Sequence, residues 1–161
     1  MAYKKKIYVS YDADDLIYYN MLQAWCSGET QEFIHYSSGN IGQKTSDEIE
    51  KVVEEKLRST ICFIVMVSDH TISLGTQMMS EINKAIELDK PIIVVNLNGK
   101  RSIDNDLCPS KLKTRMALHL SFNAKIIQKA IDTWPTYYEE NKQKGSGAHY
   151  FKPEVYKKLG I

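Results

Sequence analysis

The sequence predicts a doubly wound α/β fold, in which five parallel strands form one open sheet between two layers of helices. Two apolar runs, residues 61–67 and 91–97, lack the alternation of a half-exposed strand, which is typical of parallel strands that helices cover on both faces. Between them Met78, Ile82 and Ala85 recur at helical spacing. A strand, a helix and a strand in this order form a right-handed crossover, so we expect the two runs to be neighbouring parallel strands.

The first strand and helix come directly after a basic N-terminal stretch. Residues 6–10 are predicted to form the strand, and Asp12 or Asp14 then offers a carboxylate that can cap a helix. The residues that follow are expected to form a helix with one apolar face. This face comprises Ile17, Met21, Ala24 and Trp25.

A second strand and a second helix are predicted on either side of a polar loop. Residues 32–36 favour a strand, and residues 37–42 after them are rich in serine and glycine. Thr45 lies three residues before Glu48, the spacing at which each side chain can bond the other's backbone N–H at a helix start. The buried stripe of this helix is expected to comprise Ile49, Val52, Val53 and Leu57.

The elements after the crossover complete the predicted sheet. Residues 101–115 are polar and irregular, with one short helical turn at 110–113, and residues 117–120 predict a fifth strand. A last helix is expected to end before Pro135. Its apolar stripe comprises Ile127, Ala130, Ile131 and Trp134. We expect the flavodoxin-like strand order 2-1-3-4-5.

The length of the chain is that of one domain. A chain of 161 residues can bury a core without disulfides or a metal. Residues 144–147 contain two glycines and indicate a hinge. We therefore expect a domain at residues 1–141 and a C-terminal tail at residues 142–161.

Composition excludes several classes of partner. The formal net charge is +1, so no broad basic field is available to hold nucleic acid. No apolar run approaches the roughly 20 residues that span a bilayer, so we expect no membrane association. The three cysteines and four histidines are scattered, without the spacing of a disulfide framework or a metal site. These features favour a cytoplasmic protein with no bound metal.

The predicted sheet also indicates where a ligand should bind. In doubly wound sheets, ligands bind at the carboxyl ends of the strands, near the switch point between strands 1 and 3. Candidate contacts at this edge are Ser10, Tyr11 and Asp12 after the first strand and Ser37 after the second. Other interpretations stay open, because Ser10 and Asp12 are also suited to cap a helix. Ser37 is equally suited to a turn, and Tyr11 to covering the core.

The crossover helix carries two glutamates in different settings. Glu81 lies in its first two turns at the border of the apolar stripe, where a carboxylate can be half-buried beside a cleft. Glu87 points to the opposite, solvated side. The alternative for Glu81 is an exposed side chain paired with Lys84, which lies one turn away.

Several stretches of the chain, together with Ser37, resemble a known family. These are Ile7-Tyr8-Val9-Ser10-Tyr11 before the acidic residues, Ile64-Val65-Met66-Val67-Ser68-Asp69-His70-Thr71, and Met79-Ser80-Glu81-Ile82 leading to Lys90-Pro91-Ile92-Ile93-Val94-Val95. They resemble the TIR-like proteins of prokaryotes, and most closely the short ones that act as the signal-producing subunit of Thoeris anti-phage defence. The resemblance covers residues 5–100.

The resemblance implies a TIR-like fold and cleavage of NAD at the nicotinamide–ribose bond. In that family the glutamate at the position of Glu81 is the catalytic residue. NAD would be the substrate, so no separate cofactor is expected. The resemblance also implies an ADP-ribose-derived signal that activates a separate effector, and possible assembly as a homo-oligomer. Two positions depart from the family pattern, which usually has tryptophan at Gln77 and often has aspartate near His35.

A single carboxylate is sufficient for this reaction. The nicotinamide of NAD carries a positive charge and departs neutral, so it needs no general acid, unlike the leaving group of an ordinary glycosidase. A carboxylate can stabilise the positive charge that develops on the ribose. Water, an internal nucleophile or another small molecule would give linear, cyclic or conjugated products, and all three stay open.

Two functions of other classes remain as alternatives. A non-catalytic TIR interaction module would keep the fold and would not need Glu81. A receiver-like phosphoacceptor would use Asp69, but it also needs a lysine after strand 5, and Lys125 lies in helical sequence.

Overall fold

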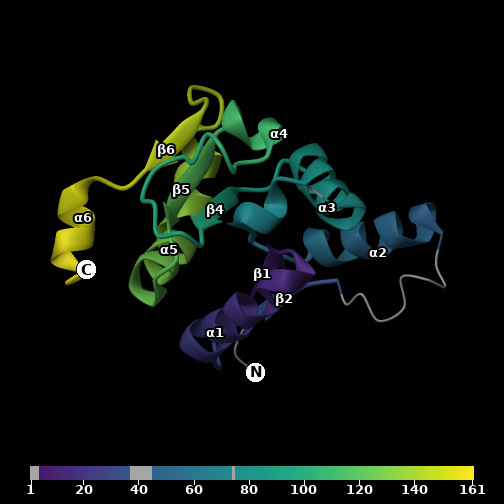
Figure 1. The fold of residues 1–161 in the computed structure, drawn as a ribbon, viewed down its shortest axis with the longest axis horizontal. Coiled ribbons are helices and arrows are strands. Elements are labelled where there is room, and N and C mark those ends of the chain that lie inside the picture. Colours follow the sequence, from purple (N-terminus) through teal and green to yellow (C-terminus); the bar gives the residue numbers. More distant parts are fainter. Residues whose placement is uncertain (1–3, 37–44, 74) are drawn as a thin grey trace.

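The chain folds around one parallel sheet of six strands (Figure 1). The computed structural model describes residues 4–36, 45–73 and 75–161. The strands are β1 (Lys5–Ser10), β2 (Gln31–Ile34), β3 (Cys62–Val67), β4 (Ile92–Asn96), β5 (Ala117–Ser121) and β6 (Ala148–Tyr150). Their order is β2-β1-β3-β4-β5-β6. The predicted order of the first five strands is therefore confirmed, with a sixth strand added at one edge.

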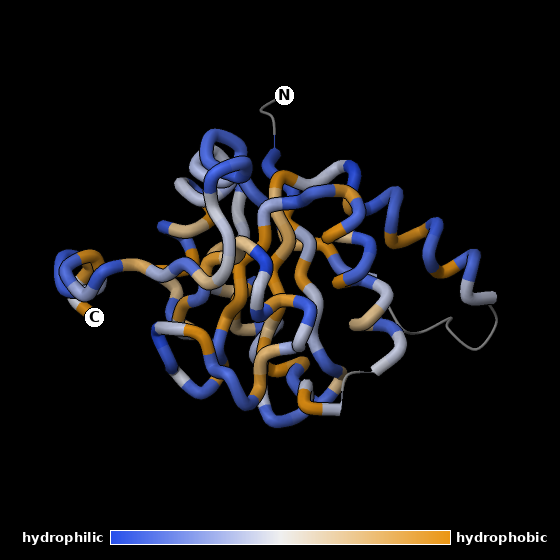
Figure 2. The backbone as a smooth tube through the Cα atoms, turned by 90° about the horizontal axis from the view of Figure 1, so that it is seen from above, coloured by the Kyte–Doolittle hydropathy of each residue, from blue (hydrophilic) through white to orange (hydrophobic). Residues whose placement is uncertain are grey.

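The two apolar runs form the centre of the sheet. β3 and β4 are parallel neighbours, with Phe63 opposite Ile92 and Val67 opposite Asn96. Every residue of both strands is buried. Figure 2 shows hydrophobic residues, in orange, gathered in the middle of the molecule. The predicted crossover is thus confirmed, and the lack of alternation reflects burial on both faces.

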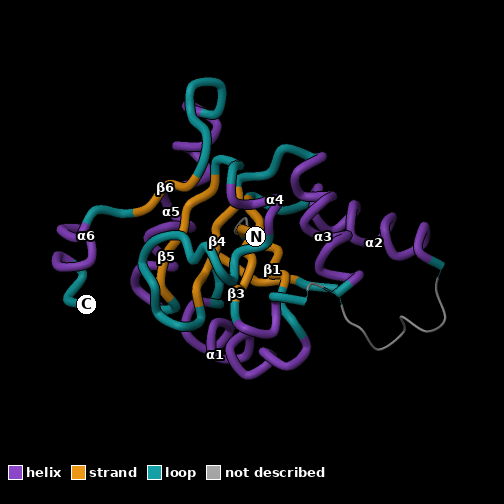
Figure 3. The backbone as a smooth tube through the Cα atoms, turned by 45° about the horizontal axis from the view of Figure 1, so that its top comes forward, coloured by secondary structure: helices purple, strands orange, loops and turns teal. Residues whose placement is uncertain are grey.

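Helices cover both faces of the sheet (Figure 3). One core cluster joins the sheet to α1 (Leu16–Cys26) and α5 (Ala124–Asn141). The other joins it to α2 (Ser46–Arg58), α3 (Thr76–Glu87) and α4 (Ser110–Lys113). Short 3-10 turns, η1 (Ala13–Asp15) and η3 (Asp69–Thr71), follow β1 and β3. No helix among the described residues is long and apolar enough to cross a membrane.

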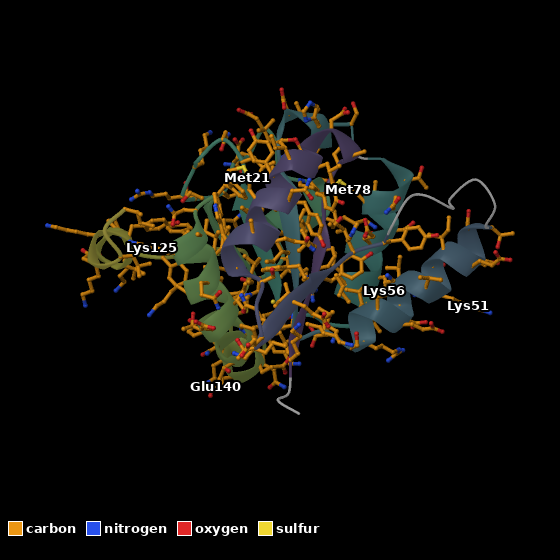
Figure 4. All side chains as sticks on the ribbon, turned by 90° about the horizontal axis from the view of Figure 1, so that it is seen from below. Met21, Lys51, Lys56, Met78, Lys125 and Glu140 are labelled. Carbon is orange, nitrogen blue, oxygen red and sulfur yellow. The ribbon has the colours of Figure 1, made fainter. Side chains whose placement is uncertain are left out.

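The apolar face predicted for α1 does not pack on the sheet. Ile17 is 65% exposed and Trp25 is 43% exposed, and Met21, labelled in Figure 4, is also exposed. The helix buries Tyr19 and Leu22 instead. The ring of Tyr19 stacks on Tyr11 and its hydroxyl accepts a hydrogen bond from Gln23. The buried face of the helix is thus offset from the predicted stripe, and the tyrosine on it weakens its apolar pattern.

The sixth strand lies in the segment that we expected to be a tail. β6 pairs with β5 in parallel, with Leu118 opposite His149. The glycines before it give the chain a tight path into the strand: a Cβ at Gly145 would lie 2.7 Å from the Met116 Sδ, and Gly147 has a φ of +70°, a conformation that favours glycine. The last helix, α6 (Pro153–Lys158), buries Tyr156 in the core. Residues 142–161 therefore add a strand and a helix to the fold.

Helix α5 continues through Pro135, so the predicted end before this residue is wrong. Proline removes one backbone donor and disfavours the helix locally. Trp134 and Tyr138, on either side of it, are both buried in the core. The Tyr138 hydroxyl also donates a hydrogen bond of 2.5 Å to Asp89 Oδ1. These tertiary contacts outweigh the local preference.

Candidate active site

A pocket of about 460 Å³ opens where β1 ends and α3 begins. This is the carboxyl edge of the sheet beside the switch point between β1 and β3, where the fold rule places ligands. Its walls comprise Tyr11, Asp12, Ala13 and Leu16 after β1, His35 and Tyr36 after β2, and Gly75, Thr76, Gln77, Met78 and Glu81 of the α3 region. Met78 is labelled in Figure 4. The volume lies in the range of small-molecule sites.

Glu81 lies at this pocket and is more buried than its position at the stripe border predicts. Its exposed fraction is 2%. The Tyr8 hydroxyl donates a hydrogen bond to Oε2, and the Ser10 hydroxyl donates one to Oε1 at 3.1 Å. Lys84 is not its partner, because its Nζ contacts Glu50 at 3.0 Å and Glu87 at 2.9 Å. The alternative of an exposed Glu81–Lys84 pair is therefore wrong.

Burial controls the protonation of this carboxyl group. Removal from water raises the pKa of Glu81 to about 7, and the hydrogen bonds from Tyr8 and Ser10 partly oppose the shift. Among the described residues, no cationic side chain forms an ion pair with Glu81. A pKa of about 7 means that the carboxylic acid and the carboxylate are both populated at neutral pH.

The other predicted site residues have different surroundings. Ser10 is buried and contacts Glu81. Tyr11 lines the pocket, stacks on Tyr19 at 4.6 Å between ring centres and shares a hydrogen bond of 3.2 Å with His35 Nδ1. Asp12 also lines the pocket and caps η1 by accepting from the Asp14 N–H. Ser37 lies outside the described residues.

Sequence reasoning did not identify Tyr8 as part of the site. Its aromatic ring favours a core position, and the residue is indeed fully buried. The available signal was its place two residues before Ser10, because alternate residues of a strand point to the same face. Glu81 packs against that face from α3, 73 positions along the chain from Tyr8.

The two departures from the family pattern also lie at the pocket. Gln77 donates a hydrogen bond from Nε2 to the Tyr36 carbonyl oxygen at 3.3 Å. Burial and the charge of Lys56 lower the pKa of His35. The pocket wall therefore carries an amide and a neutral imidazole at these positions.

A serine, a histidine and an aspartate also meet where the turns after β1 and β3 come together. The Ser68 hydroxyl donates to Asp15 Oδ2 at 2.6 Å, and His70 Nδ1 lies 2.9 Å from Asp15 Oδ1. Because the serine proton is directed to the carboxylate, the geometry differs from that of an activated nucleophile. The contacts connect the turns after β1 and β3. In the described ranges, no three histidine, cysteine, aspartate or glutamate side chains form a metal-binding group.

A comparison with protein families finds a match that agrees with the observed fold and includes the residues of the candidate site. The model of the Thoeris protein ThsB, TIR-like domain, matches residues 8–102, which is more than half of the chain. Glu81 and both of its hydrogen-bond donors lie inside this range. A comparison with curated proteins finds no match. The chain therefore belongs to the family of Thoeris ThsB TIR-like domains.

Proposed function

We propose that this protein cleaves the nicotinamide–ribose bond of NAD and that Glu81 is its catalytic carboxylate. The observation that supports this most strongly is the position of Glu81, a buried carboxylate at a pocket with two neutral donors and no ion-pair partner among the described residues. A carboxylate without a cationic partner keeps its charge available for a positive substrate.

The chemistry needs only the ionised form of this group. The bond between the anomeric carbon and the nicotinamide nitrogen breaks, and both electrons leave with nicotinamide, which becomes neutral. Positive charge then develops on the ribose, and the Glu81 anion stabilises it. A nucleophile forms the new bond at the anomeric carbon and releases a proton. Since the nicotinamide ring itself is cationic, its binding also favours ionisation of Glu81.

The other pocket residues suit different parts of the NAD molecule. We infer that Tyr11 offers an aromatic surface for a base, because its ring is held by Tyr19 and its hydroxyl by His35. Asp12 provides an acceptor at the pocket wall. Both residues, with Ser10, are proposed to position NAD or the catalytic carboxylate. Ser37 stays a proposed contact on the basis of the family resemblance.

Membership of the Thoeris TIR-like family supports a role in anti-phage defence. We propose that the product is an ADP-ribose-derived signal, with a cyclic form favoured, and that it activates a separate effector. The second candidate is a non-catalytic TIR interaction module. The burial of an ionisable group at a pocket favours the enzyme, because an interaction module gains nothing from that cost.

The test is a direct assay of NAD turnover by the full chain. Purified protein is incubated with NAD, alone and with extract of phage-infected cells, and nicotinamide and the ribose-containing products are identified by mass spectrometry. We expect stoichiometric nicotinamide and one dominant ADP-ribose-derived product. No nicotinamide under either condition, with the protein folded, would support the interaction module instead.

A further inference from the structure

Tyr8 reaches the candidate catalytic carboxylate from the core of the protein. The residue lies in β1, is fully buried and packs its ring against Phe63 at 5.6 Å between centroids. A ring held in this way has few accessible rotamers, so its hydroxyl has a fixed position. That hydroxyl donates to Glu81 Oε2.

The two donors of Glu81 bind different oxygens. Tyr8 contacts Oε2 and Ser10 contacts Oε1. Both donors come from the same face of β1, and the carboxylate comes from α3. Both oxygens of the Glu81 carboxylate are therefore bound by side chains of one strand. Each oxygen still has a lone pair that can accept a hydrogen bond from a ribose hydroxyl.

We propose that Tyr8 is a positioning residue, which holds the Glu81 carboxylate in one orientation and favours its ionised form, with Ser10 as a second donor. This role rests on the proposed function of Glu81. A hydrogen bond to a carboxylate stabilises the anion relative to the acid. Without the Tyr8 donor, burial would oppose ionisation more strongly, and less of the protein would carry the active anion at neutral pH.

Other ionisable groups around Glu81 do not explain such an effect. Among the described residues, those at the pocket or in contact with Glu81 are Tyr8, Tyr11, Asp12, His35 and Tyr36. Burial raises the pKa of Tyr8 and of Tyr11, so both stay neutral donors in the physiological range. Burial and the charge of Lys56 lower the pKa of His35, which favours its neutral imidazole.

The experiment measures the titration of Glu81 without any need for turnover. The full chain is labelled with ¹³C at glutamate side-chain carboxyl carbons, and the Glu81 signal is assigned by its loss in Glu81→Gln. We expect Tyr8→Phe to move the Glu81 midpoint upward by at least about one pH unit, the scale of a hydrogen bond to a charged group. Ser10→Ala should shift it in the same direction. Tyr156→Phe is the matched control, because it removes a buried hydroxyl that contacts the Ser121 N–H instead.

A second variant keeps the test decisive if Tyr8→Phe weakens the fold. Site-specific 3-fluorotyrosine at position 8 keeps the hydroxyl and makes it a stronger donor, so the Glu81 midpoint should move downward. Opposite shifts in the two variants support the positioning role. An unchanged midpoint in either folded variant would overturn it.

Turnover provides the functional readout and separates the two proposals. In Tyr8→Phe, the acid side of the profile of kcat/KM for NAD should move upward with the midpoint, so that raising the pH restores part of the activity. An equal loss at every pH would indicate a merely structural role and would contradict the proposal. If the midpoints shift but no form of the protein cleaves NAD, the proposed function fails while the contact between Tyr8 and Glu81 stands.

Discussion

Two carboxylates at opposite edges of the sheet each accept a tyrosine hydroxyl, yet their surroundings differ in charge. Glu81, at the carboxyl edge, is bound by Tyr8 and Ser10. Asp89, which precedes β4 at the amino edge, accepts from Tyr138 and also forms ion pairs with Arg115 at 3.2 Å and Lys142 at 2.7 Å. Asp89 lies at a hollow of about 770 Å³, larger than the candidate active site.

The cations Arg115 and Lys142 neutralise Asp89, whereas Glu81 has no such partner among the described residues. Burial alone would raise the pKa of Asp89, but hydrogen bonds from Lys142 and Tyr138 and the nearby positive charges lower it overall. Burial raises the pKa of Glu81 to about 7, since only neutral donors oppose it. The larger hollow therefore surrounds a satisfied ion cluster, whereas the smaller pocket contains a carboxylate that forms no ion pair with any cation in the described part of the chain. Pocket size alone would therefore indicate the edge of the sheet opposite the candidate active site.

The largest expected effect is the loss of NAD cleavage in Glu81→Gln. The substitution keeps the size of the side chain, replaces one acceptor oxygen by an NH2 donor and removes the negative charge. Nicotinamide release should therefore fall about a hundredfold to a thousandfold, as when one preorganised electrostatic group is removed. Asp89→Asn is the matched control and should keep near-normal turnover. If the two variants lost NAD cleavage to the same extent, the proposed difference in function between Glu81 and Asp89 would be wrong.

The second expected effect is a gain of stability in the same Glu81→Gln variant. The folded pKa of Glu81, about 7, exceeds its ordinary value of 4.5. Between these pH values the folded protein binds more protons than the unfolded chain, so the stability of the wild type falls as pH rises. Glu81→Gln avoids the cost of ionising a buried carboxyl group. Its free energy of unfolding should therefore exceed that of the wild type by up to about 3 kcal/mol at pH 8, with little difference at pH 4.5. Urea denaturation at both pH values measures this, and identical curves at pH 8 would contradict a buried, ionising Glu81.

A smaller effect of opposite sign is expected for Asp89→Asn. Asp89 has a φ of +55°, which asparagine also tolerates, so the change removes charge without adding backbone strain. Losing the ion pairs should lower the Tm at pH 7 by roughly 2–4 °C. Because the pKa of Asp89 is lowered, its stabilisation is present above the ordinary pKa and is lost as pH falls through the folded pKa. Thermal melts that show no difference at pH 7 would mean that the cluster contributes no stability.

The smallest effect is expected for Glu87→Gln on the same helix as Glu81. Glu87 has a 63% exposed side chain, and its partner Lys84 keeps a second contact with Glu50. Surface changes of this kind usually alter the free energy of unfolding by less than about 0.5 kcal/mol. Turnover should also be unchanged. A large loss of activity in this variant would show that helix α3 carries catalytic function outside the pocket.

Local patterns predicted most of the sheet but not its last strand. β3 and β4 are recognisable because both of their faces are buried, which leaves unbroken apolar runs. β6 has only three residues, none of them fully buried, and follows two glycines, so it carries no such pattern. Its pairing with β5 depends on tertiary contacts, which also carry α5 through Pro135.

The candidate site shows the same limit at the level of single residues. Helical periodicity separates Glu81 from Glu87, and the family resemblance singles out Glu81. The degree of burial of Glu81 could not be predicted, because it depends on Tyr8 and Ser10, which are more than 70 positions away. The orientation of α1 was likewise predicted wrongly, because the helix turns Tyr19 and Leu22 toward the core and leaves the predicted apolar face exposed.

The pH dependence of NAD cleavage by the wild-type protein tests the role of Glu81 most directly. If the Glu81 anion is the active form, kcat/KM should rise about tenfold per pH unit below the folded pKa of about 7 and become level above it. The midpoint should coincide with that of the Glu81 carboxyl signal. A profile that is flat between pH 5 and pH 9, in a protein that remains folded and active, would contradict an ionising Glu81 as the catalytic group.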